Sequence, residues 1–420
     1  MSELEKFFKL SPNDLRSANV IEEFANTLIC DSTACSASHI HIQRSAKGAD
    51  VWYRVAGALL SIGTLTTEVA DKLLLRFKLL ADIDVKELRR VQDGRIRVVP
   101  NGDLWCSFMP SFKGWTLVLT WQSQHRKKNG QLSELGMVAS QQAKSLNLLS
   151  SDHGILVLSG YRGSYGVPAV GRSLLMEASR NGRIAVALEY GSRRPIAGVN
   201  QCDIRSIPSL TGNDWFNVAI RQQADVIFVE VPDYDFFDKL VLRAAEDCLI
   251  IVEMTRPIEM SACTINPAKR QAIAEMMLGS INQRLHRRIC EQCHFLYQPR
   301  LYELNALGLK CSDRSRLTFA KNVGCPACRN NWWWNDQMIG THEVVSMTGE
   351  IQELYSQDAP QDELRKSILR SGIITHFQSA VSKVMQQDIA AATIVSNFRE
   401  RIASNQWLDI DKLSLLLTKD

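Results

Sequence analysis

The hydrophobic pattern of the chain changes near residue 150, from short interrupted runs to longer continuous ones. Between residues 38 and 121, short apolar runs are separated by turn sequences, which is the pattern of β-strands. One stretch here, about Thr66–Leu80, has the spacing of a helix instead. We therefore expect a small α+β domain at residues 36–122, preceded by a helical segment at 1–35. Asp93–Gly94 in this region has the composition of a hairpin turn.

From Ser151 onward, strand-like and helical segments alternate. The strand-like runs are continuously apolar and read GILVLSG, RIAVALEY, ADVIFVEV and CLIIVEM. The helical segments between them are Val170–Arg180, Trp215–Gln223 and Phe236–Glu246. This alternation predicts a parallel sheet with helices on both faces. We expect an α/β domain at residues 151–282, after a linker and helix at 123–150.

Composition and charge narrow the class of protein. The 420 residues are 45% hydrophobic and 22% charged, which is ordinary for a globular chain of two to four domains. A formal net charge of +4 is too small to indicate nucleic acid or a membrane surface as partner. The first residues do not form a signal peptide, and the chain has no uncharged apolar stretch of about 18 residues. We expect a cytoplasmic protein with no transmembrane segment.

Four of the eleven cysteines form two pairs with metal-ligand spacing. Cys290 and Cys293 form one Cys-x-x-Cys pair, and Cys325 and Cys328 form the second. Four thiolates suit a closed tetrahedral Zn²⁺ site with structural rather than catalytic character. We predict a zinc-binding subdomain at residues 283–345, followed by a helical region at 346–420. Cys311, His286 and His294 are weaker candidate ligands.

A glycine-rich segment follows the first strand of the α/β domain, where a phosphate-binding loop would lie. A working loop has the form G-x-x-x-x-G-K-[ST], in which the lysine and the hydroxyl serve the phosphates and Mg²⁺. Counting from Gly160, this chain has Tyr165, Gly166 and Val167 at the three defining positions. Backbone N–H groups could still bind phosphate, and the residues that would present them are Gly160, Gly163, Ser164 and Gly166. A tight turn without ligand is the favoured interpretation.

Several segments together resemble one family. The stretch ASHIHIQRSAKGADVWYRVAGAL resembles a segment of the form ASDIHIEP…VRYRIDG in the ATPases of type II secretion and type IV pilus assembly. RFKLLADIDVKELRRVQDGRI, GVNQ, ADVIFVEV and QRLHRRICEQC continue the resemblance in order, over roughly residues 36–355. The resemblance implies a hexameric RecA-like motor domain preceded by a PAS-like domain. It also implies a tetracysteine insertion at the two cysteine pairs.

Compared with that family, the chain lacks most of the groups that hydrolyse ATP. The acidic box E-D-P-x-E keeps Glu189 alone among its acids, and the Walker B motif has Val231 at its glutamate and Glu230 one place early. Cys248 and Thr255 stand where two histidines belong. Phosphoryl transfer depends on positioning and charge stabilisation, so losing these groups together should abolish it. Glu189 and Glu230 are the remaining candidate catalytic acids, and ATP and Mg²⁺ are doubtful cofactors.

Three arginines match family positions that face the nucleotide site of the same or a neighbouring subunit. These are Arg76, Arg90 and Arg95, whose alternative interpretation is solvated or salt-bridged surface. Trp332, Trp333 and Trp334 follow the second cysteine pair, where they indicate either a protein contact or packing onto the zinc subdomain.

The sequence therefore predicts a catalytically degenerate member of the secretion and pilus motor family. Its expected role is assembly or regulation, through a homo- or hetero-hexamer with an active motor or contact with the inner-membrane platform protein. The expected location is the cytoplasm, peripheral to the inner membrane. An active ATPase with displaced acids and a nucleotide sensor remain as alternatives.

Overall fold

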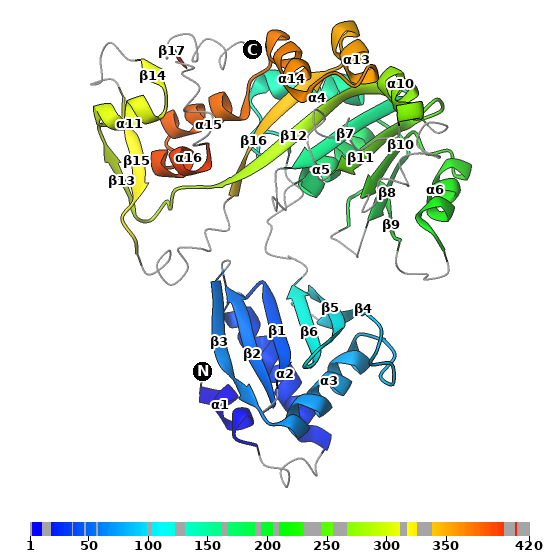
Figure 1. The fold of residues 1–420 in the computed structure, drawn as a ribbon, viewed down its shortest axis with the longest axis vertical. Coiled ribbons are helices and arrows are strands. Elements are labelled where there is room, and N and C mark those ends of the chain that lie inside the picture. The colour runs from blue at the N-terminus through cyan, green and yellow to red at the C-terminus, as the bar shows by residue number, and fades with distance from the viewer. Residues whose placement is uncertain are drawn as a thin grey trace. The chain divides into compact units, whose positions relative to one another are not determined.

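The structure is a computed structural model in which most, but not all, of the chain can be described. The described residues are 2–10, 18–35, 37–45, 48–55, 58–98, 102–121, 131–160, 167–189, 195–204, 210–230, 245–254, 267–310, 317–325, 338–398 and 408–409. They form two compact units (Figure 1). The first contains Met1–Lys127, and the second contains Lys128–Gly324 and Gln337–Asp420; the stretch Cys325–Asp336 is grouped with the first.

The first unit is a six-stranded antiparallel sheet with the strand order β3-β2-β1-β6-β5-β4. Its elements are α1 (Ser2–Phe8), α2 (Ala18–Ala34), β1 (His39–Ser45), β2 (Gly48–Val55), β3 (Ala58–Leu65), α3 (Thr67–Leu80), β4 (Gln92–Val98), β5 (Gly102–Ser111) and β6 (Gly114–Trp121). The expected helix near Thr66–Leu80 is thus present as α3. Alternate residues of the strands point into the core, as the short apolar runs predicted.

The helices at the N-terminus belong to the core of this unit. Phe24 of α2 is fully buried, with its ring 4.7 Å from that of Phe7 and 5.9 Å from that of Phe8. The same cluster includes Ile40 of β1 and Tyr53 of β2. Helices α1 and α2 therefore fold together with the sheet that follows them, because their apolar faces are buried against it.

The predicted hairpin turn at Asp93–Gly94 is wrong. Both residues lie within β4, where Asp93 pairs with Ser107 and Gly94 with Cys106. A side chain at position 94 would come within 2.2 Å of the carbonyl oxygen of Ala81, at the end of α3. Glycine is needed here so that the strand can approach the helix closely, and this contact between distant segments leaves no local signal.

The second unit is built on a seven-stranded sheet with the order β16-β12-β7-β11-β10-β8-β9. Its strands are β7 (Gly154–Gly160), β8 (Ala185–Glu189), β9 (Val199–Asp203), β10 (Val226–Glu230), β11 (Leu249–Met254), β12 (Met277–Arg287) and β16 (Met338–Ser346). All neighbouring strands are parallel except the β12–β16 pair at the edge. The predicted parallel sheet is confirmed.

Helices cover both faces of this sheet (Figure 1). One face packs on α4 (Ala139–Leu149) and α5 (Val167–Arg180), and the other on α6 (Gly212–Arg221), α10 (Pro267–Met276), α13 (Gly349–Ser356) and α14 (Gln361–Arg370). Helices α4, α5 and α6 correspond to predicted helices. Most of the predicted helix at 236–246 lies outside the described residues.

Two strands of the sheet, β12 and β16, extend it beyond the expected limit of the α/β domain. β12 runs without interruption through residues 282 and 283, where the sequence indicated a domain boundary. Its inner positions include the buried polar residues Asn282, Gln283 and His286, which hide its strand character in a hydrophobicity pattern. The cysteine-containing segment therefore begins at the end of a strand of the main sheet.

The remaining elements form a smaller cluster next to β12 and β16. They are β13 (His294–Tyr297), α11 (Leu301–Ala306), β14 (Leu309–Lys310), β15 (Phe319–Asn322), α15 (His376–Met385), α16 (Ala391–Asn397) and β17 (Leu408–Asp409). β13 and β15 form a two-stranded antiparallel ribbon, and Phe319 packs with Val381 and Val384 of α15. In the described part of the chain, no helix combines the length and apolar character needed to cross a membrane.

Candidate functional site

Three glutamates lie at the carboxyl ends of adjacent parallel strands. Glu189 ends β8, Glu230 ends β10, and Glu253 on β11 is the register partner of Glu230. Their neighbours two residues earlier, Ala187, Phe228 and Ile251, pack on the face covered by α5. Because side chains alternate along a strand, the three glutamates point to that same face. Ligands of open parallel sheets bind at this edge, so it is the first candidate site.

The glycine-rich loop leads from this edge into α5. Gly160 ends β7, and α5 begins at Val167, which is buried. Gly163, Ser164 and Gly166, together with Tyr165, lie outside the described residues. The structure therefore confirms the strand and the helix on either side of the loop.

Glu189 is engaged in a buried ion pair. Its side chain is 2% exposed, and Nη1 of Arg172 on α5 lies 2.9 Å from Oε1 and 3.2 Å from Oε2. Nε2 of Gln201 on β9 donates to Oε2 at 3.0 Å. Oε1 of Gln201 in turn accepts from the backbone N–H of Ile196 at 2.7 Å. The carboxylate is thus neutralised by α5 and oriented by β9, whose Gln201 is itself held by the backbone of Ile196.

Sequence reasoning missed Arg172. The residue lies among apolar side chains of α5, next to buried Gly171 and two residues from buried Leu174. A cation on the apolar face of a helix rarely stays buried without a partner, and this was the available signal. No motif of the family resemblance includes the position.

The amino acids at the defining positions of the loop do not fit a magnesium-bound nucleotide held in the usual way. Val167 offers no hydroxyl to a metal, and Gly166 offers no ammonium to phosphate. Glu189, the retained acid of the acidic box, already accepts hydrogen bonds from Arg172 and Gln201. Cys248 is buried at the amino end of β11, and burial raises the pKa of its thiol to about 11. It is therefore an inert core residue.

Two of the three family-matched arginines are bound within the first unit. Arg76 pairs with Glu22 of α2 at 2.9 Å, and Nε of Arg95 donates to Asp103 of β5 at 2.8 Å. Arg90 is different because its side chain is 86% exposed, 4.0 Å from Glu87. Of the three, Arg90 is therefore the one whose side chain is presented to solvent.

Lys78 holds the loop that carries Arg90. This lysine of α3 is fully buried, with Nζ donating to the carbonyl oxygens of Glu87 at 2.6 Å and Asp84 at 3.2 Å. The same Nζ lies 3.8 Å from the ring centre of Phe108. Burial lowers the pKa of this amine, whereas the carboxylates of Asp84 and Glu87 act in the opposite direction. The loop geometry therefore depends on this side chain together with Gln92, whose Nε2 also donates to the carbonyl oxygen of Glu87 at 2.6 Å.

Replacing this lysine should loosen the loop. Lys78→Met removes two charge-assisted hydrogen bonds, and we expect the first unit to lose about 2–4 kcal/mol of unfolding free energy. Trypsin should then cleave after Arg89 or Arg90 faster than in the wild type. Lys72→Met, on the exposed side of the same helix, is the control. Equal cleavage rates in the two variants would contradict this account of the loop.

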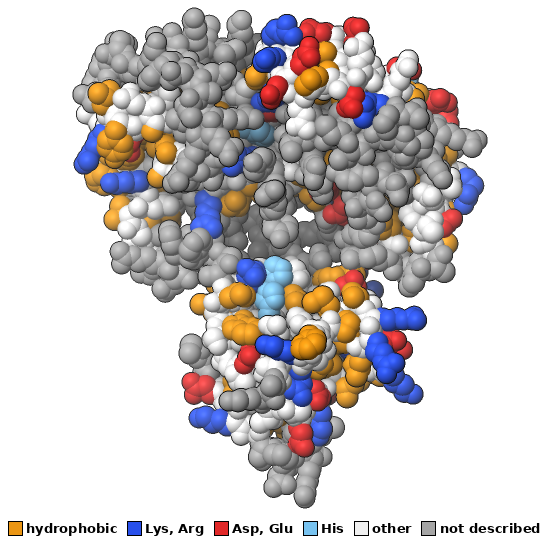
Figure 2. Space-filling view, in the orientation of Figure 1, with side chains coloured by type: hydrophobic (Ala, Val, Ile, Leu, Met, Phe, Trp, Pro, Cys, Tyr) orange, Lys and Arg blue, Asp and Glu red, His pale blue; other side chains and the backbone are white. Residues whose placement is uncertain are grey.

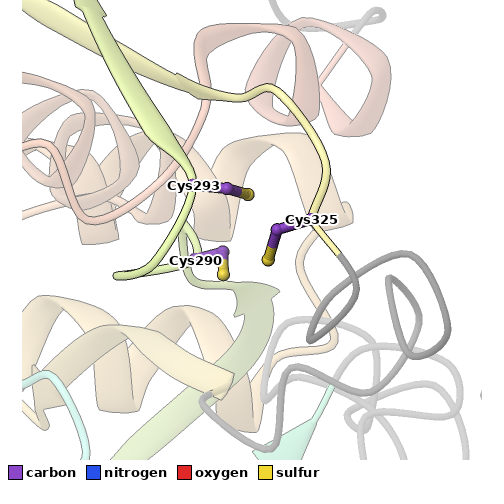
Figure 3. Close-up of side chains that lie close together, drawn as sticks. All are labelled: Cys290, Cys293 and Cys325. Carbon is purple, nitrogen blue, oxygen red and sulfur yellow. The ribbon is translucent and has the colours of Figure 1, made fainter.

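Three cysteines form a sulfur cluster at the end of β12 (Figure 3). The Sγ atoms of Cys290, Cys293 and Cys325 all lie within 4.8 Å of one another. Tetrahedral Zn²⁺ with Zn–S bonds of about 2.3 Å separates its sulfurs by roughly 3.8 Å, so the cluster fits such an ion with small adjustment. Cys328 and Cys311 lie outside the described residues, as do Trp332, Trp333 and Trp334. Three of the four cysteines in the two predicted pairs therefore lie close together, and the fourth, Cys328, is outside the described residues.

Backbone hydrogen bonds bring the cysteine-bearing segments together. The N–H of Val323 donates to the carbonyl oxygen of Cys293 at 3.1 Å, and that of Cys290 to Oδ1 of Asn322 at 2.7 Å. Cys325 follows three residues after Asn322, the last residue of β15. The other two ligand candidates lie elsewhere: His286 bonds to Thr341, and His294 is exposed near the carbonyl of Glu291.

The visible surface of the first unit mixes both signs of charge. Figure 2 shows acidic, basic and hydrophobic side chains interspersed over the described part of the face turned to the viewer. A nucleic-acid partner requires a continuous basic stripe or patch, and the described residues of this face do not form one.

Most of the chain is similar to proteins of one known family. The sequence profile of a family described as "Type II/IV secretion system protein" matches residues 14–247 and 251–398. The type IV pilus assembly ATPase PilB of Acinetobacter baylyi is 27% identical over 384 residues, which cover 89% of this chain and 65% of that protein. The putative type II secretion system protein E of Escherichia coli is 24% identical, over 90% of this chain and 79% of that protein.

Solved structures agree in fold. The pilus retraction motor PilT with bound ADP aligns with a TM-score of 0.60 and 17% identity, covering 88% of this chain and 95% of that one. The Legionella pneumophila ATPase DotB aligns with a TM-score of 0.57 and 14% identity, covering 91% and 95%. Because the family profile spans most of the sequence, from the first unit through the parallel sheet to the helices beyond β16, this chain belongs to the type II/IV secretion system protein family.

Proposed function

We propose that this chain is a non-hydrolysing member of its family that assists or regulates a secretion or pilus motor. The observation that carries the proposal is the buried ion pair between Glu189 and Arg172. The remaining acid of the acidic box is thereby committed to a partner within the chain. The loss of the lysine and hydroxyl at positions 166 and 167 supports the same conclusion.

The domain organisation of the proposal follows the family resemblance. We assign the first unit to a PAS-like domain, supported by its antiparallel sheet with helices packed on one face. We assign the second unit to a RecA-like domain with a degenerate phosphate loop. The sulfur cluster of Cys290, Cys293 and Cys325, with Cys328 as the fourth ligand, would hold a structural Zn²⁺.

The proposed setting is a cytoplasmic assembly beside the inner membrane. The chain would enter a homo- or hetero-hexamer with a related motor ATPase, or contact the inner-membrane platform protein of a pilus or secretion machine. Arg90 is the best-presented of the family-matched arginines for a contact between subunits, since its side chain is exposed. One relative named as a type IV pilus assembly ATPase and another named as a putative type II secretion system protein support the class of machine.

One observation favours an active enzyme as a second candidate. Glu230 and Glu253 are register partners at the carboxyl edge, and Glu230 is less buried than Glu189. Two such carboxylates could bind Mg²⁺ and orient a water molecule if backbone N–H groups of the loop held the phosphate. The missing lysine argues against this enzyme, and binding without hydrolysis would make the chain a nucleotide sensor.

Nucleotide titration separates these functions. We expect no ATP turnover by the purified chain, and no saturable binding of a fluorescent ATP analogue with Mg²⁺ up to millimolar concentration. Saturable binding without turnover would favour the sensor. Turnover that is abolished by Glu230→Gln would overturn the proposal in favour of the enzyme. The control is Asp152→Asn, at an exposed position before the amino end of β7, which should not abolish this turnover.

A further inference from the structure

Arg172 supplies positive charge at the place where the family relies on a metal-bound nucleotide. It is the sixth residue of α5, the helix that directly follows the glycine-rich loop. Its side chain is 8% exposed, and that of Glu189 is 2% exposed. An ionised carboxylate with so little access to water requires a cation close by, either a metal ion or a cationic side chain.

We propose that Arg172 is a built-in replacement for the metal ion of that nucleotide complex, so that Glu189 at this edge of the sheet is charge-balanced without Mg²⁺ or nucleotide. The inference rests on the proposed function and adds the residue that makes the site independent of ligand. Val167 and Gly166 provide neither the hydroxyl nor the ammonium group that ordinarily binds Mg²⁺ and nucleotide phosphate. The inference therefore concerns only side chains of this chain.

The geometry around Glu189 supports this role. Nη1 of Arg172 bridges both carboxylate oxygens, at 2.9 and 3.2 Å, so the positive charge lies centrally between them. Gln201 adds a third hydrogen bond, to Oε2, and is itself fixed by the N–H of Ile196. The two oxygens therefore already accept three hydrogen bonds, and a metal ion would have to displace Arg172 to reach them.

A second buried ion pair in the same unit provides a matched control. Arg365 of α14 donates to Glu343 of β16 at 2.7 and 2.8 Å, with side-chain exposures of 16% and 2%. It has the same chemistry as the Arg172 pair. It lies on the other face of the sheet, because Val345, two residues after Glu343, packs with residues of α13 and α14, whereas Glu189 points to the face covered by α5. A purely structural ion pair should behave alike at both places.

The test compares Arg172→Met, Glu189→Gln, the double variant and Arg365→Met with the wild type, without nucleotide. Thermal unfolding is measured in EDTA and in MgCl₂, and binding of Mn²⁺ alone is followed by its electron paramagnetic resonance signal. Removing one partner of a buried pair should lower the Tm by about 10 °C in EDTA. At 100 times its Kd, a divalent ion should restore about 5 °C to Arg172→Met.

The expected result is that Arg172→Met gains Mn²⁺ binding and metal-dependent stability, whereas the wild type, the double variant and Arg365→Met show neither. Arg172→Lys, which keeps the charge, should also remain metal-independent. If Arg172→Met does not fold in EDTA, it should fold in MgCl₂, whereas Arg365→Met should gain nothing from MgCl₂. Equal Mn²⁺ binding by the wild type and Arg172→Met would overturn the inference, as would equal metal effects in Arg172→Met and Arg365→Met. ATP turnover by the wild type would instead overturn the proposed function, and the Mn²⁺ comparison would remain readable.

Discussion

Lowering the pH from 7.5 to 5 should remove about 4 kcal/mol of unfolding free energy from the second unit, because it buries two histidines in neutral form. Burial, helped by Arg284, His376 and Lys383, lowers the pKa of His286 to about 3. Burial likewise holds the pKa of His342 well below its usual value. An unfolded histidine has a pKa of about 6.5, so the unfolded chain takes up two protons that the folded unit excludes.

The sign follows from these directions. The stabilisation is fully present above about pH 6.5 and is lost as the pH falls below it, by about 2 kcal/mol per histidine at pH 5. Glu343 does not contribute over this range. Its burial would raise its pKa, but His376 and Arg365 outweigh burial and hold the value at about 2, so the carboxylate stays ionised.

The surroundings of these histidines offer little compensation for added charge. His286 and His376 both hydrogen-bond to the hydroxyl of Thr341, at 3.1 Å each. The ring nitrogens of His342 have no hydrogen-bond partner among the described residues. Lys383 lies on α15 of the same cluster and donates to the carbonyl of Gly136 at 2.8 Å. Protonation would add positive charge to a region that is already cationic.

Urea unfolding at pH 7.5 and 5 measures this effect. His342→Phe replaces the buried imidazole with an apolar ring, and we expect it to reduce the loss by about half. His153→Gln, at an exposed position in the same unit, should leave the loss unchanged. Release of a bound metal in acid would affect both variants alike. The prediction is wrong if His342→Phe and the wild type lose the same free energy.

Removing the proposed zinc ion should unfold the smaller cluster of elements around β13 and β15, whereas the parallel sheet should stay folded. The ribbon of β13 and β15 has four residues in each strand, and a two-stranded ribbon of this size is marginal in water. Structural zinc contributes about 10–16 kcal/mol of apparent binding free energy in small zinc domains. Cys293→Ser should therefore increase amide hydrogen exchange in β13, β15 and α11 by at least about 100-fold, with little change in β7 and β11.

The control and the metal content make this test specific. Cys202→Ala removes a half-buried thiol on β9, outside the sulfur cluster, and should leave both exchange and metal content unchanged. The wild type should carry one zinc per chain by mass spectrometry of the digested protein. A metal-free wild type, or unchanged exchange in Cys293→Ser, would show that the sulfurs do not hold a structural ion.

Much of the fold could be predicted from local patterns. The apolar runs of β7, β8, β10 and β11 are long and uniformly buried, so their parallel pairing followed from alternation with helices. β12 could not be found in this way, because its buried positions include Asn282, Gln283 and His286. Tertiary contacts accommodate these polar groups, and hydrophobicity along the chain does not report them.

The candidate sites, like the fold, could be predicted only in part from the sequence. The spacing of the cysteines was sufficient to predict a metal cluster, because each pair brings its own two ligands close together in the sequence. The absence of the lysine and the hydroxyl from the phosphate loop could likewise be established from the amino-acid sequence alone. Arg90 differs from Arg76 and Arg95 in the exposure of its side chain, which is 86% against 29% and 30%, and that required the fold.

The amino-acid sequence was therefore enough to indicate the family, the parallel sheet, the two Cys-x-x-Cys pairs and the missing phosphate-binding groups, since each leaves a recognisable pattern in short stretches of the chain. The pairing of Arg172 with Glu189 depends on contacts between a helix and strands that are separate in sequence. So does the complete burial of His342. Such contacts determine the charge of these side chains and their access to water. For that reason the chemistry of the Arg172–Glu189 pair and of His342 could be argued only from the folded chain.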